Sequence, residues 1–286
     1  MPELPEVEIA ARLIGAEIRS RPPRVESTLA PGVNALKTFD PPLHALDGST
    51  LTGVSRRGKH LVVESDAGLV LLIHLMSAGR LQLYDKHAGP RDRTSRLLVR
   101  LEDSRELRLR EFGSKQAAWV KLLRVDALEE DDALSTLGPE AWPDPGGAAR
   151  LKELLDAPRP LHTLLRDQRT IAGIGRSWVD EILWQAKLSP YKRGADLDER
   201  EAEALREAIV ATLGGAISHY EQAVSLPIPD KLPLPLQVHR HEGEPCPRCG
   251  TTLRAVHFED YVIAYCPECQ TEGRVLKDRR LSRLLR

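Results

Sequence analysis

The four cysteines of this 286-residue chain form two pairs, Cys246-Pro247-Arg248-Cys249 and Cys266-Pro267-Glu268-Cys269. Sixteen residues separate the pairs, a spacing typical of a four-cysteine metal site on a β-hairpin. Each pair offers two ligands from one turn of chain, and four protein ligands leave no open position for catalysis. Two disulfides are the alternative, which a reducing compartment disfavours. We therefore predict one structural Zn²⁺ held by Cys246, Cys249, Cys266 and Cys269, with His257 as a bystander.

The rest of the sequence divides into a strand-rich part and a helical part. Apolar spacing predicts a helix from Leu4 to about Ile18. Short β-rich runs separated by turn residues follow and predict an antiparallel sandwich or barrel. These runs are Leu51–Ser55, His60–Glu64, Leu69–Leu75, Arg80–Tyr84, Arg96–Leu101, Glu106–Arg110 and Ala117–Leu123.

A stretch rich in Pro, Gly and Asp from Gly138 to Gly147 reads as a linker between domains. The last helix expected beyond it has its cap near Asp196 and is stopped by Gly214-Gly215. Pro227 to Pro235 is expected to cross in an extended conformation, because its prolines exclude helix. The expected helices are Leu151–Leu155, Leu161–Asp167, Ser177–Ala186 and Leu197–Leu213.

The overall charge of the chain does not indicate a nucleic-acid ligand. The formal net charge is −1, but acidic and basic residues are segregated. Acids cluster at 129–132 and from Asp196 to Glu207, and bases at 56–59 and at the carboxyl end. A segregated charge can still form a local DNA-facing surface. No apolar run has membrane-spanning length, and no secretory signal opens the chain, so a cytoplasmic protein is expected.

The amino terminus carries the strongest chemical signal. Removal of Met1 before the small Pro2 would leave a terminal secondary amine. Such an amine loses its proton near neutrality and can attack a carbonyl-like carbon. Glu3 and Glu6 follow on the expected helix, where one carboxylate can carry protons and the other can orient a sugar. The alternative is an ordinary acidic first turn that favours the helix dipole.

The string Pro2-Glu3-Leu4-Pro5-Glu6-Val7-Glu8 resembles the amino terminus of formamidopyrimidine-DNA glycosylases and endonuclease VIII. Further segments resemble the same family in the expected order. They are Arg56-Arg57-Gly58-Lys59, His74–Leu81, Arg110-Glu111-Phe112-Gly113, the helix–two-turn–helix element Ile171–Leu183, and the zinc-finger hairpin Gln237–Gln270.

The resemblance implies an α+β fold: an N-terminal helix plus an antiparallel β-sandwich, then a helical helix–two-turn–helix domain with a C-terminal zinc-finger β-hairpin. The expected domains are a catalytic sandwich at 1–133, a linker at 134–149, a DNA-binding helical domain at 150–240, a four-cysteine finger at 241–273 and a basic tail at 274–286. It also implies a nucleoid-associated monomer that binds damaged DNA and no membrane.

The resemblance further implies a bifunctional DNA glycosylase and abasic-site lyase of base excision repair, acting on a base rotated out of the duplex. Pro2 would attack C1′ and expel the base, leaving an iminium that permits β- and δ-elimination. Glu3 would carry protons, Glu6 would position the sugar and Lys59 would bind phosphate. The expected DNA-contacting residues are His74, Arg110, Phe112, Gly175, Arg176 and Tyr261.

Several positions depart from the family pattern. Arg176 stands where the family has a phosphate-binding Asn, Tyr261 where the hairpin has an Arg, and His162 where 8-oxoguanine enzymes have a Lys. Met76-Ser77 is offset from the family's Gly-Met, and the Gly-Gly-Ser/Thr-x-Leu-Arg-Asp string is absent near Ser218–Pro235. Residues 270–286 continue past the finger with six Lys/Arg against two acids.

These departures leave the lesion open: an oxidised pyrimidine, a bulky adduct or damage in single strands is as plausible as an oxidised purine. They also motivate a weakly catalytic or inactive DNA-damage-binding protein on the same scaffold. A zinc-stabilised protein–protein adaptor is a third reading, supported only by the near-neutral charge.

Overall fold

The computed structural model describes residues 2–32, 34–89, 92–112, 116–258 and 261–276. The chain forms two compact units. The first comprises residues 1–136 and 217–233, and the second residues 137–216 and 234–286. Residues 277–286, most of the expected basic tail, lie outside the described residues, as does Gly113.

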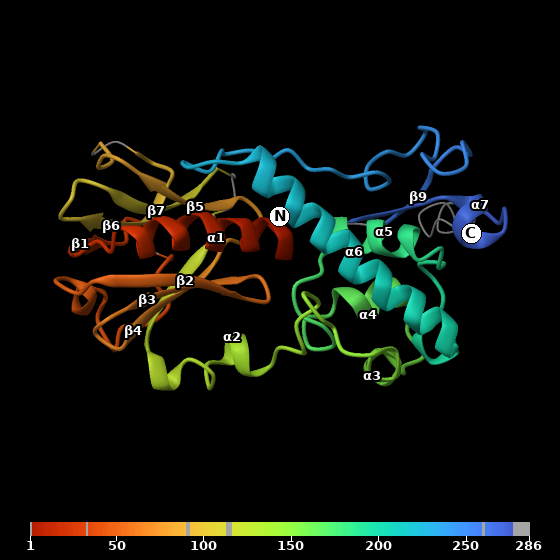
Figure 1. The fold of residues 1–286 in the computed structure, drawn as a ribbon, viewed down its shortest axis with the longest axis horizontal. Coiled ribbons are helices and arrows are strands. Elements are labelled where there is room, and N and C mark those ends of the chain that lie inside the picture. Colours follow the sequence, from red (N-terminus) through yellow and green to blue (C-terminus); the bar gives the residue numbers. More distant parts are fainter. Residues whose placement is uncertain (1, 33, 90–91, 113–115, 259–260, 277–286) are drawn as a thin grey trace, which may run out of the picture. The chain divides into compact units, whose positions relative to one another are not determined.

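The first unit contains the expected sandwich of two antiparallel four-stranded sheets (Figure 1). In one sheet the order is β1 (Val25–Leu29), β6 (Ser95–Leu101), β7 (Glu106–Glu111) and β5 (Gly79–Tyr84). In the other it is β2 (Leu51–Arg57), β3 (His60–Ser65), β4 (Leu69–His74) and β8 (Trp119–Arg124). Side chains alternate across a strand, and the inward set is apolar, including Leu61, Leu71, Ile73, Leu97 and Leu109 at no more than 1% exposure.

Helix α1 (Leu4–Ser20) lies between the sheets and contacts β2 and β3 of one and β5 of the other (Figure 1). Leu4, Val7, Ile14 and Ile18 are fully buried on it. Each such side chain contributes about 1.5–3 kcal/mol relative to exposure. This burial fixes the amino terminus, and therefore Pro2 and Glu3, against the sandwich.

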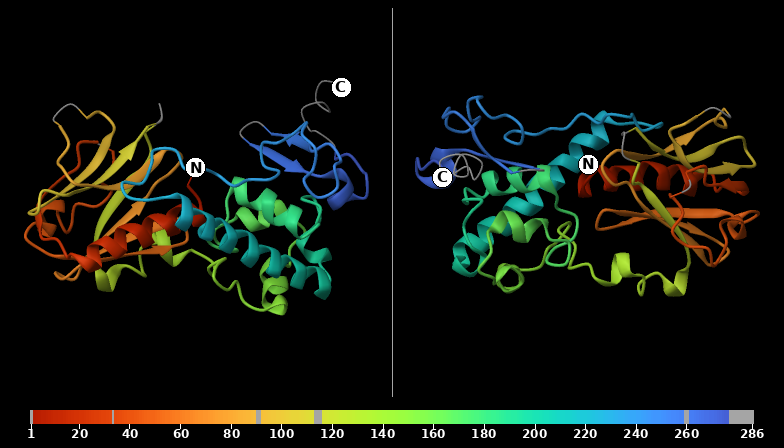
Figure 2. Two further views of the ribbon diagram at one scale, coloured as in Figure 1. Left: turned by 45° about the horizontal axis from the view of Figure 1, so that its top comes forward. Right: turned by 180° about the vertical axis from the view of Figure 1, so that it is seen from behind.

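The second unit is built around α5 (Arg176–Gln185), which contacts α4 (Leu161–Arg166), β10 (Val262–Tyr265) and α7 (Pro267–Thr271) (Figure 2). Strand β9 (Arg254–His257) pairs with β10 to form the expected hairpin. The unit also contains α3 (Ala148–Leu155) and the 3₁₀ turn η3 (Gly194–Asp196).

Helix α6 (Glu199–Ala223) corrects the expectation that Gly214-Gly215 stops it. Two helical glycines cost about 1 kcal/mol each relative to Ala, but Leu213, Ile217 and Tyr220 around them are buried to within 2%. Gly214 also passes Trp142, whose Nε1 would lie 3.2 Å from a Cβ at that position. Packing therefore overrides propensity, and α6 runs on from the second unit into the first.

The start of α6 also differs from the expectation. The Asp198 and Glu201 side chains accept reciprocal backbone hydrogen bonds at 2.7 and 3.0 Å. This arrangement is a capping box, so the cap lies at Asp198 and not at Asp196, which belongs to η3.

Four elements of the first unit were not expected: β1, the 3₁₀ turns η1 (Leu43–Leu46) and η2 (Val125–Ala127), and the short α2 (Asp132–Ser135). Strand β1 lies at the edge of its sheet with a mostly polar sequence, so the apolar pattern did not mark it. Helix α2 is capped by Asp131, which accepts from Ala133 N and binds Lys121 Nζ at 2.8 Å.

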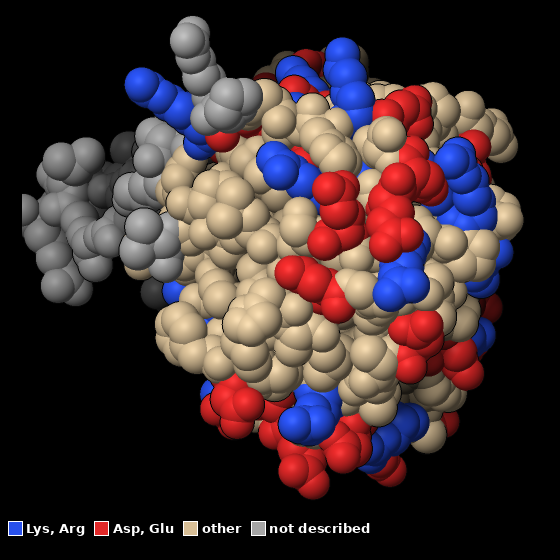
Figure 3. All heavy atoms as spheres, turned by 90° about the vertical axis from the view of Figure 1, so that its left-hand side faces the viewer, with Lys and Arg blue, Asp and Glu red and all other residues tan. Residues whose placement is uncertain are grey.

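The stretch from Pro227 to Pro235 contains no helix, as expected. Within the described residues, no helix combines the length and apolar character needed to cross a membrane. The face of the molecule drawn in Figure 3 carries acidic and basic side chains intermixed among a larger uncharged area.

Candidate active site and nucleic-acid interface

Pro2, Glu3 and Glu6 lie together at the start of α1 and all three are buried. Glu3 is the residue before the helix, with extended backbone, and its N–H donates to Glu6 Oε2 at 2.7 Å. The exposed fractions of Glu3 and Glu6 are 1% and 6%. A buried carboxylate is stable only when it is hydrogen-bonded or paired, so the Glu6 position is strongly constrained.

Tyr220 from α6 supplies the second constraint on Glu6, since its hydroxyl donates to Glu6 Oε1 at 2.7 Å. Burial, followed by the negative charge of Glu6, raises the pKa of Tyr220. The phenol therefore keeps its proton at physiological pH and acts as a hydrogen-bond donor. No sequence motif marks Tyr220, because Gly214-Gly215 predicts that the helix ends before it.

Arg80 adds a positive charge to the same region. Its Nε donates to the Asp230 carbonyl oxygen at 3.0 Å. Burial lowers the pKa of Arg80, while Glu6, Asp230 and Tyr220 oppose that change. Strand β5 begins at Gly79, immediately before Arg80. A Cβ at Gly79 would lie 2.3 Å from the Leu75 carbonyl oxygen, so this position requires glycine.

Lys59 occupies the turn between β2 and β3 and is only 7% exposed. Behind it, His60, His74 and Trp119 form an aromatic group, with centroids 4.7 Å apart for the two histidines and 5.7 Å for His74 and Trp119. Burial lowers the pKa of His60 to about 4. Burial, His60 and Lys59 together lower the pKa of His74 to about 3, so both histidines are neutral at neutral pH.

His74 also fixes the turn after β4, because its Nδ1 accepts from Met76 N at 3.0 Å. Met76 has a positive φ of 48°. Arg56, in the basic turn of the motif, points inward: its Nε binds Glu8 Oε2 at 2.8 Å and its side chain is 5% exposed. Arg56 therefore joins the turn to α1 and is not part of an exposed basic surface.

Arg110 and Phe112 stand two residues apart at the end of β7, and their side chains differ in exposure. Phe112 is 40% exposed, whereas the Arg110 side chain is 20% exposed. Arg110 is held by Thr94 Oγ1 and Tyr84 Oη at 2.9 Å each, and its guanidinium lies 4.5 Å from the Phe112 ring. The geometry gives Phe112 an open position and Arg110 a supporting one.

The two turns before α5 are held by Gln168. Its Nε2 donates to the Ile174 carbonyl oxygen at 2.8 Å and its Oε1 accepts from Gly173 N at 2.9 Å. Gly173 has a φ of +106°, which favours glycine. Gly175 precedes α5 with extended backbone and contributes no capping side chain, which leaves Arg176 as the first helical residue.

Tyr261 lies at the centre of an aromatic and cationic cluster in the second unit. Its ring stacks on Phe258, with centroids 4.5 Å apart and planes at 6°, and lies parallel to His162 at 5.8 Å. The guanidinium carbons of Arg166 and Arg176 lie 4.3 and 5.6 Å from its centroid. Tyr261 carries no charge, but it gathers two arginines that do. Arg166 was not expected from the sequence.

Acidic residues of α5 hold the hairpin segment in place. Asp180 Oδ2 contacts His239 Nδ1 at 2.7 Å and accepts from Ala264 N at 3.0 Å, and its Oδ1 lies 3.3 Å from His162 Nε2. Glu181 accepts from the backbone N–H groups of 237, 238 and 239. His162, which stands at the position of a family Lys, is therefore a buried structural contact with 1% of its surface exposed.

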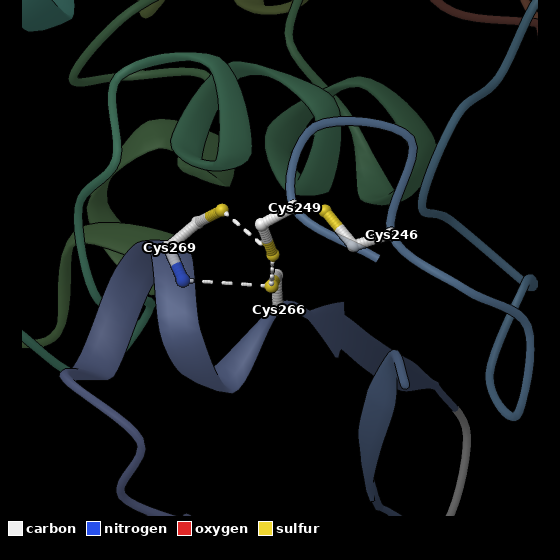
Figure 4. Close-up of side chains that lie close together, drawn as sticks. All are labelled: Cys246, Cys249, Cys266 and Cys269. Atoms are coloured by element: carbon white, nitrogen blue, oxygen red, sulfur yellow. Dashed lines mark hydrogen bonds between the residues drawn. The ribbon is translucent and has the colours of Figure 1, made fainter. Parts of the chain in front are cut away.

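The four cysteines converge as predicted (Figure 4), with ligand atoms that all lie within 4.8 Å of one another. Cys249 Sγ is 3.5 Å from Cys266 Sγ and 3.4 Å from Cys269 Sγ, far beyond a disulfide bond of about 2.05 Å. Tetrahedral bonding at about 2.3 Å places sulfurs about 3.8 Å apart, so the set fits one metal ion. His257 pairs with Glu242 at 3.2 Å instead.

The cysteine cluster is attached to α5 through Trp184. The indole Nε1–H donates to Cys246 Sγ at 3.4 Å. Arg248, between the first two cysteines, places its guanidinium 4.2 Å from the Trp184 ring and donates to the Trp184 carbonyl oxygen at 2.8 Å. The cysteine cluster and the helix that begins at Arg176 therefore form one packed assembly.

Family models match three parts of the chain. Residues 1–114 match the N-terminal domain of formamidopyrimidine-DNA glycosylase, and residues 137–227 match its H2TH domain. Residues 243–271 match the zinc finger found in FPG and IleRS. The third match covers all four cysteines.

Whole-length relatives agree. The chain is 33% identical over 279 residues to a formamidopyrimidine-DNA glycosylase of a Roseiflexus species, covering 94% of this chain and 100% of the relative. It is 31% identical over 283 residues to the enzyme of Lactococcus lactis subsp. cremoris, covering 94% and 99%.

Solved structures of Lactococcus lactis Fpg are also similar. One, in complex with DNA containing N7-benzyl-Fapy-dG, has a TM-score of 0.82 at 27% identity and covers 94% of this chain and 100% of that one. Another, bound non-covalently to DNA containing an abasic site, has a TM-score of 0.79 at 27% identity, covering 94% and 99%. The fold, the three domain matches and the full-length identity place this chain in the formamidopyrimidine-DNA glycosylase family of DNA-repair glycosylases.

Proposed function

We propose that this chain is a bifunctional enzyme that excises a damaged base and then cuts the strand at the resulting abasic site, with the Pro2 amine as nucleophile. The observation that carries the proposal is the buried group of Pro2, Glu3 and Glu6 at the start of α1. A secondary amine enclosed beside two carboxylates is suited to attack on C1′ with proton transfer nearby.

The Pro2 nitrogen forms a bond to C1′ as the C1′–base bond breaks, and the base leaves with the electron pair and a proton. The sugar ring opens, O4′ takes a proton and an iminium forms. The iminium acidifies C2′–H, and loss of that proton expels the 3′ phosphate. We assign proton transfer to Glu3, sugar positioning to Glu6 and phosphate binding to Lys59.

DNA contact is proposed to involve both units. In the first, Phe112 is exposed and positioned to enter the space left by an everted base, with Arg110 beneath it. Insertion of an apolar side chain recovers part of the cost of unstacking. His74, neutral and fixed beside Lys59, supports the neighbouring turn.

In the second unit, Arg166 and Arg176 are proposed to bind backbone phosphate, with Tyr261 holding their guanidiniums and Gly175 allowing close approach. Arginine suits phosphate because its donors form a planar fork. The cysteines are proposed to hold one structural Zn²⁺, since four thiolates in a tetrahedral set match that ion. The protein is proposed to act as a monomer.

Borohydride trapping tests the nucleophile. Protein with Met1 removed, incubated with an abasic-site oligonucleotide and sodium borohydride, is expected to form a covalent adduct visible on a gel. Pro2→Gly should reduce the adduct to background and still bind the oligonucleotide, because a primary amine there lacks the ring that shapes the iminium. Pro5→Ala, which alters the other proline of the motif inside α1, is the matched control and should trap normally.

Two results would contradict the proposal. An undiminished adduct from protein that retains Met1 or an amino-terminal tag, in which the Pro2 nitrogen is an amide, would place the nucleophile elsewhere. No adduct from native protein that binds the oligonucleotide would favour a damage-binding protein on this scaffold.

A further inference from the structure

The carboxylate of Glu6 accepts one hydrogen bond from within the amino-terminal motif and one from outside it. Oε2 accepts the Glu3 N–H at 2.7 Å, and Oε1 accepts the Tyr220 O–H at 2.7 Å. Tyr220 lies 214 residues from Glu6 in the chain. A carboxylate that accepts on both oxygens is held in one orientation, and hydrogen bonds to an ionised acceptor are about twice as strong as neutral ones.

Tyr220 reaches Glu6 only because α6 continues beyond Gly214-Gly215. Its side chain is fully buried, at 0% exposure. Apolar packing explains the ring but not the hydroxyl, because a buried hydroxyl without a partner costs about 1–3 kcal/mol. The partner that removes this cost is Glu6.

We propose that Tyr220 is a positioning residue for the excision and lyase reactions, which holds the Glu6 carboxylate in one orientation toward the sugar. This inference rests on the proposed function, in which Glu6 positions the sugar. Tyr220 acts through Glu6 and has no assigned contact with the reacting atoms.

The charged groups around Glu6 agree with this role. Glu3 faces it from the start of α1, Tyr220 from α6 and Arg80 from β5. Asp230, on the extended crossing, lies beside Arg80, which binds its carbonyl oxygen. Arg80 offsets the burial of a negative charge, and the Tyr220 hydroxyl supplies direction.

The test is a double-mutant cycle between Tyr220→Phe and Glu6→Gln, read as the rate of adduct formation on an abasic-site oligonucleotide at saturating concentration. Tyr220→Phe keeps the buried ring and should slow adduct formation about 10- to 100-fold, the range expected for a hydrogen bond to a charged group. In the Glu6→Gln background the same change should have no more than about a twofold effect, because interacting sites are not additive.

A pH profile separates positioning from packing. Without the Tyr220 donor, the Glu6 carboxylate is protonated more readily, so the acid limb of the rate profile should move to higher pH. Tyr265→Phe is the matched control. It removes a buried hydroxyl that accepts from Leu276 N in the second unit and should leave the rate and the profile unchanged. Equal melting temperatures confirm that the variants are folded.

Three outcomes would overturn the inference. The first is an unchanged rate in Tyr220→Phe, and the second is an equal loss in the wild-type and Glu6→Gln backgrounds. Both leave the proposed function standing when the wild type still traps. The third is absence of a wild-type adduct, which overturns the proposed function and this inference together.

Discussion

The first unit and the second unit solve different physical problems. In the first, the proposed catalytic groups are buried, and the Glu6 carboxylate is fixed by hydrogen bonds from Glu3 N–H and Tyr220. In the second, guanidiniums lie at an intermediate exposure over an aromatic ring, and a cysteine cluster holds the hairpin. Catalysis requires each group to be held in a precise position, so the loss of a single hydrogen bond in the first unit should reduce activity strongly. Phosphate binding sums many screened contacts, so single losses should be small.

Metal removal should produce the largest loss of stability among these changes, and this loss should be confined to the second unit. Structural zinc sites contribute about 10–16 kcal/mol of apparent binding free energy. A strong chelator or Cys249→Ser should therefore unfold β9, β10 and α7 and abolish specific DNA binding. Hydrogen exchange should show lost protection at 254–271, with Trp184 fluorescence changing as its Cys246 contact is lost.

Strands β2, β3 and β4 provide the internal control for that experiment. They belong to the first unit, whose core contains none of the cysteines, so their protection should persist. Loss of protection in both units to the same extent would show that the stability of the first unit also depends on the metal.

Acid should destabilise the first unit through His60 and His74. Their pKa values, lowered by burial to about 4 and about 3, lie below the unfolded value of about 6.5. The unfolded state therefore binds more protons below pH 6.5, and stability is lost as pH falls toward the folded values. Each histidine should cost about 1.4 kcal/mol per pH unit, up to about 2 kcal/mol at pH 5.

Urea unfolding between pH 7.5 and 5 measures this dependence. His74→Gln removes one titrating group and should flatten the pH dependence by up to the amount for one histidine. His87→Gln, which changes a histidine 3.9 Å from Glu26, should not flatten it. A slope identical in wild type and His74→Gln would place the acid sensitivity elsewhere.

Arg166→Ala should give the smallest effect. Loss of one phosphate contact lowers the slope of log affinity against log salt by about 0.9, with a several-fold weaker affinity near physiological salt. Binding of an abasic-site duplex at several salt concentrations tests this. Arg150→Ala, which removes an exposed arginine paired with Glu153, is the control and should leave the slope unchanged. A loss as large as that of Pro2→Gly in trapping at saturating DNA would show that Arg166 serves the chemistry.

Much of the fold was predictable because its signals are local. Seven of the eight sandwich strands alternate or lie between clear turns, whereas β1 has too few apolar residues and depends on pairing Val25 with Leu101. The predicted strand from Ala117 begins at Trp119, since Ala117 N and Ala118 N instead donate to the Glu111 carboxylate. The glycine pair in α6 wrongly predicts the end of the helix. Burial of Leu213, Ile217 and Tyr220 contributes more free energy than the two helical glycines cost.

The candidate site divides in the same way. Pro2, Glu3, Glu6, Lys59 and the cysteines stand in short motifs whose chemistry is readable from residue type and spacing. Tyr220 and Arg166 stand in no motif, and Arg80 stands in the His74–Leu81 segment without a role that the sequence indicates. Each is placed by a neighbour distant in the chain. Tyr261 was expected to contact DNA in place of an arginine, and its packing shows a ring that gathers two arginines.

The sequence by itself determined the clustering of the four cysteines, the amino-terminal Pro-Glu motif and the succession of sandwich, helices and hairpin, because each depends on spacing within a few residues. Tertiary structure alone decided how those groups are held: Tyr220 on Glu6, Arg166 on Tyr261 and Trp184 on Cys246. The physical reason is that burial and hydrogen bonding act between neighbours in space, whereas local patterns record only neighbours in sequence.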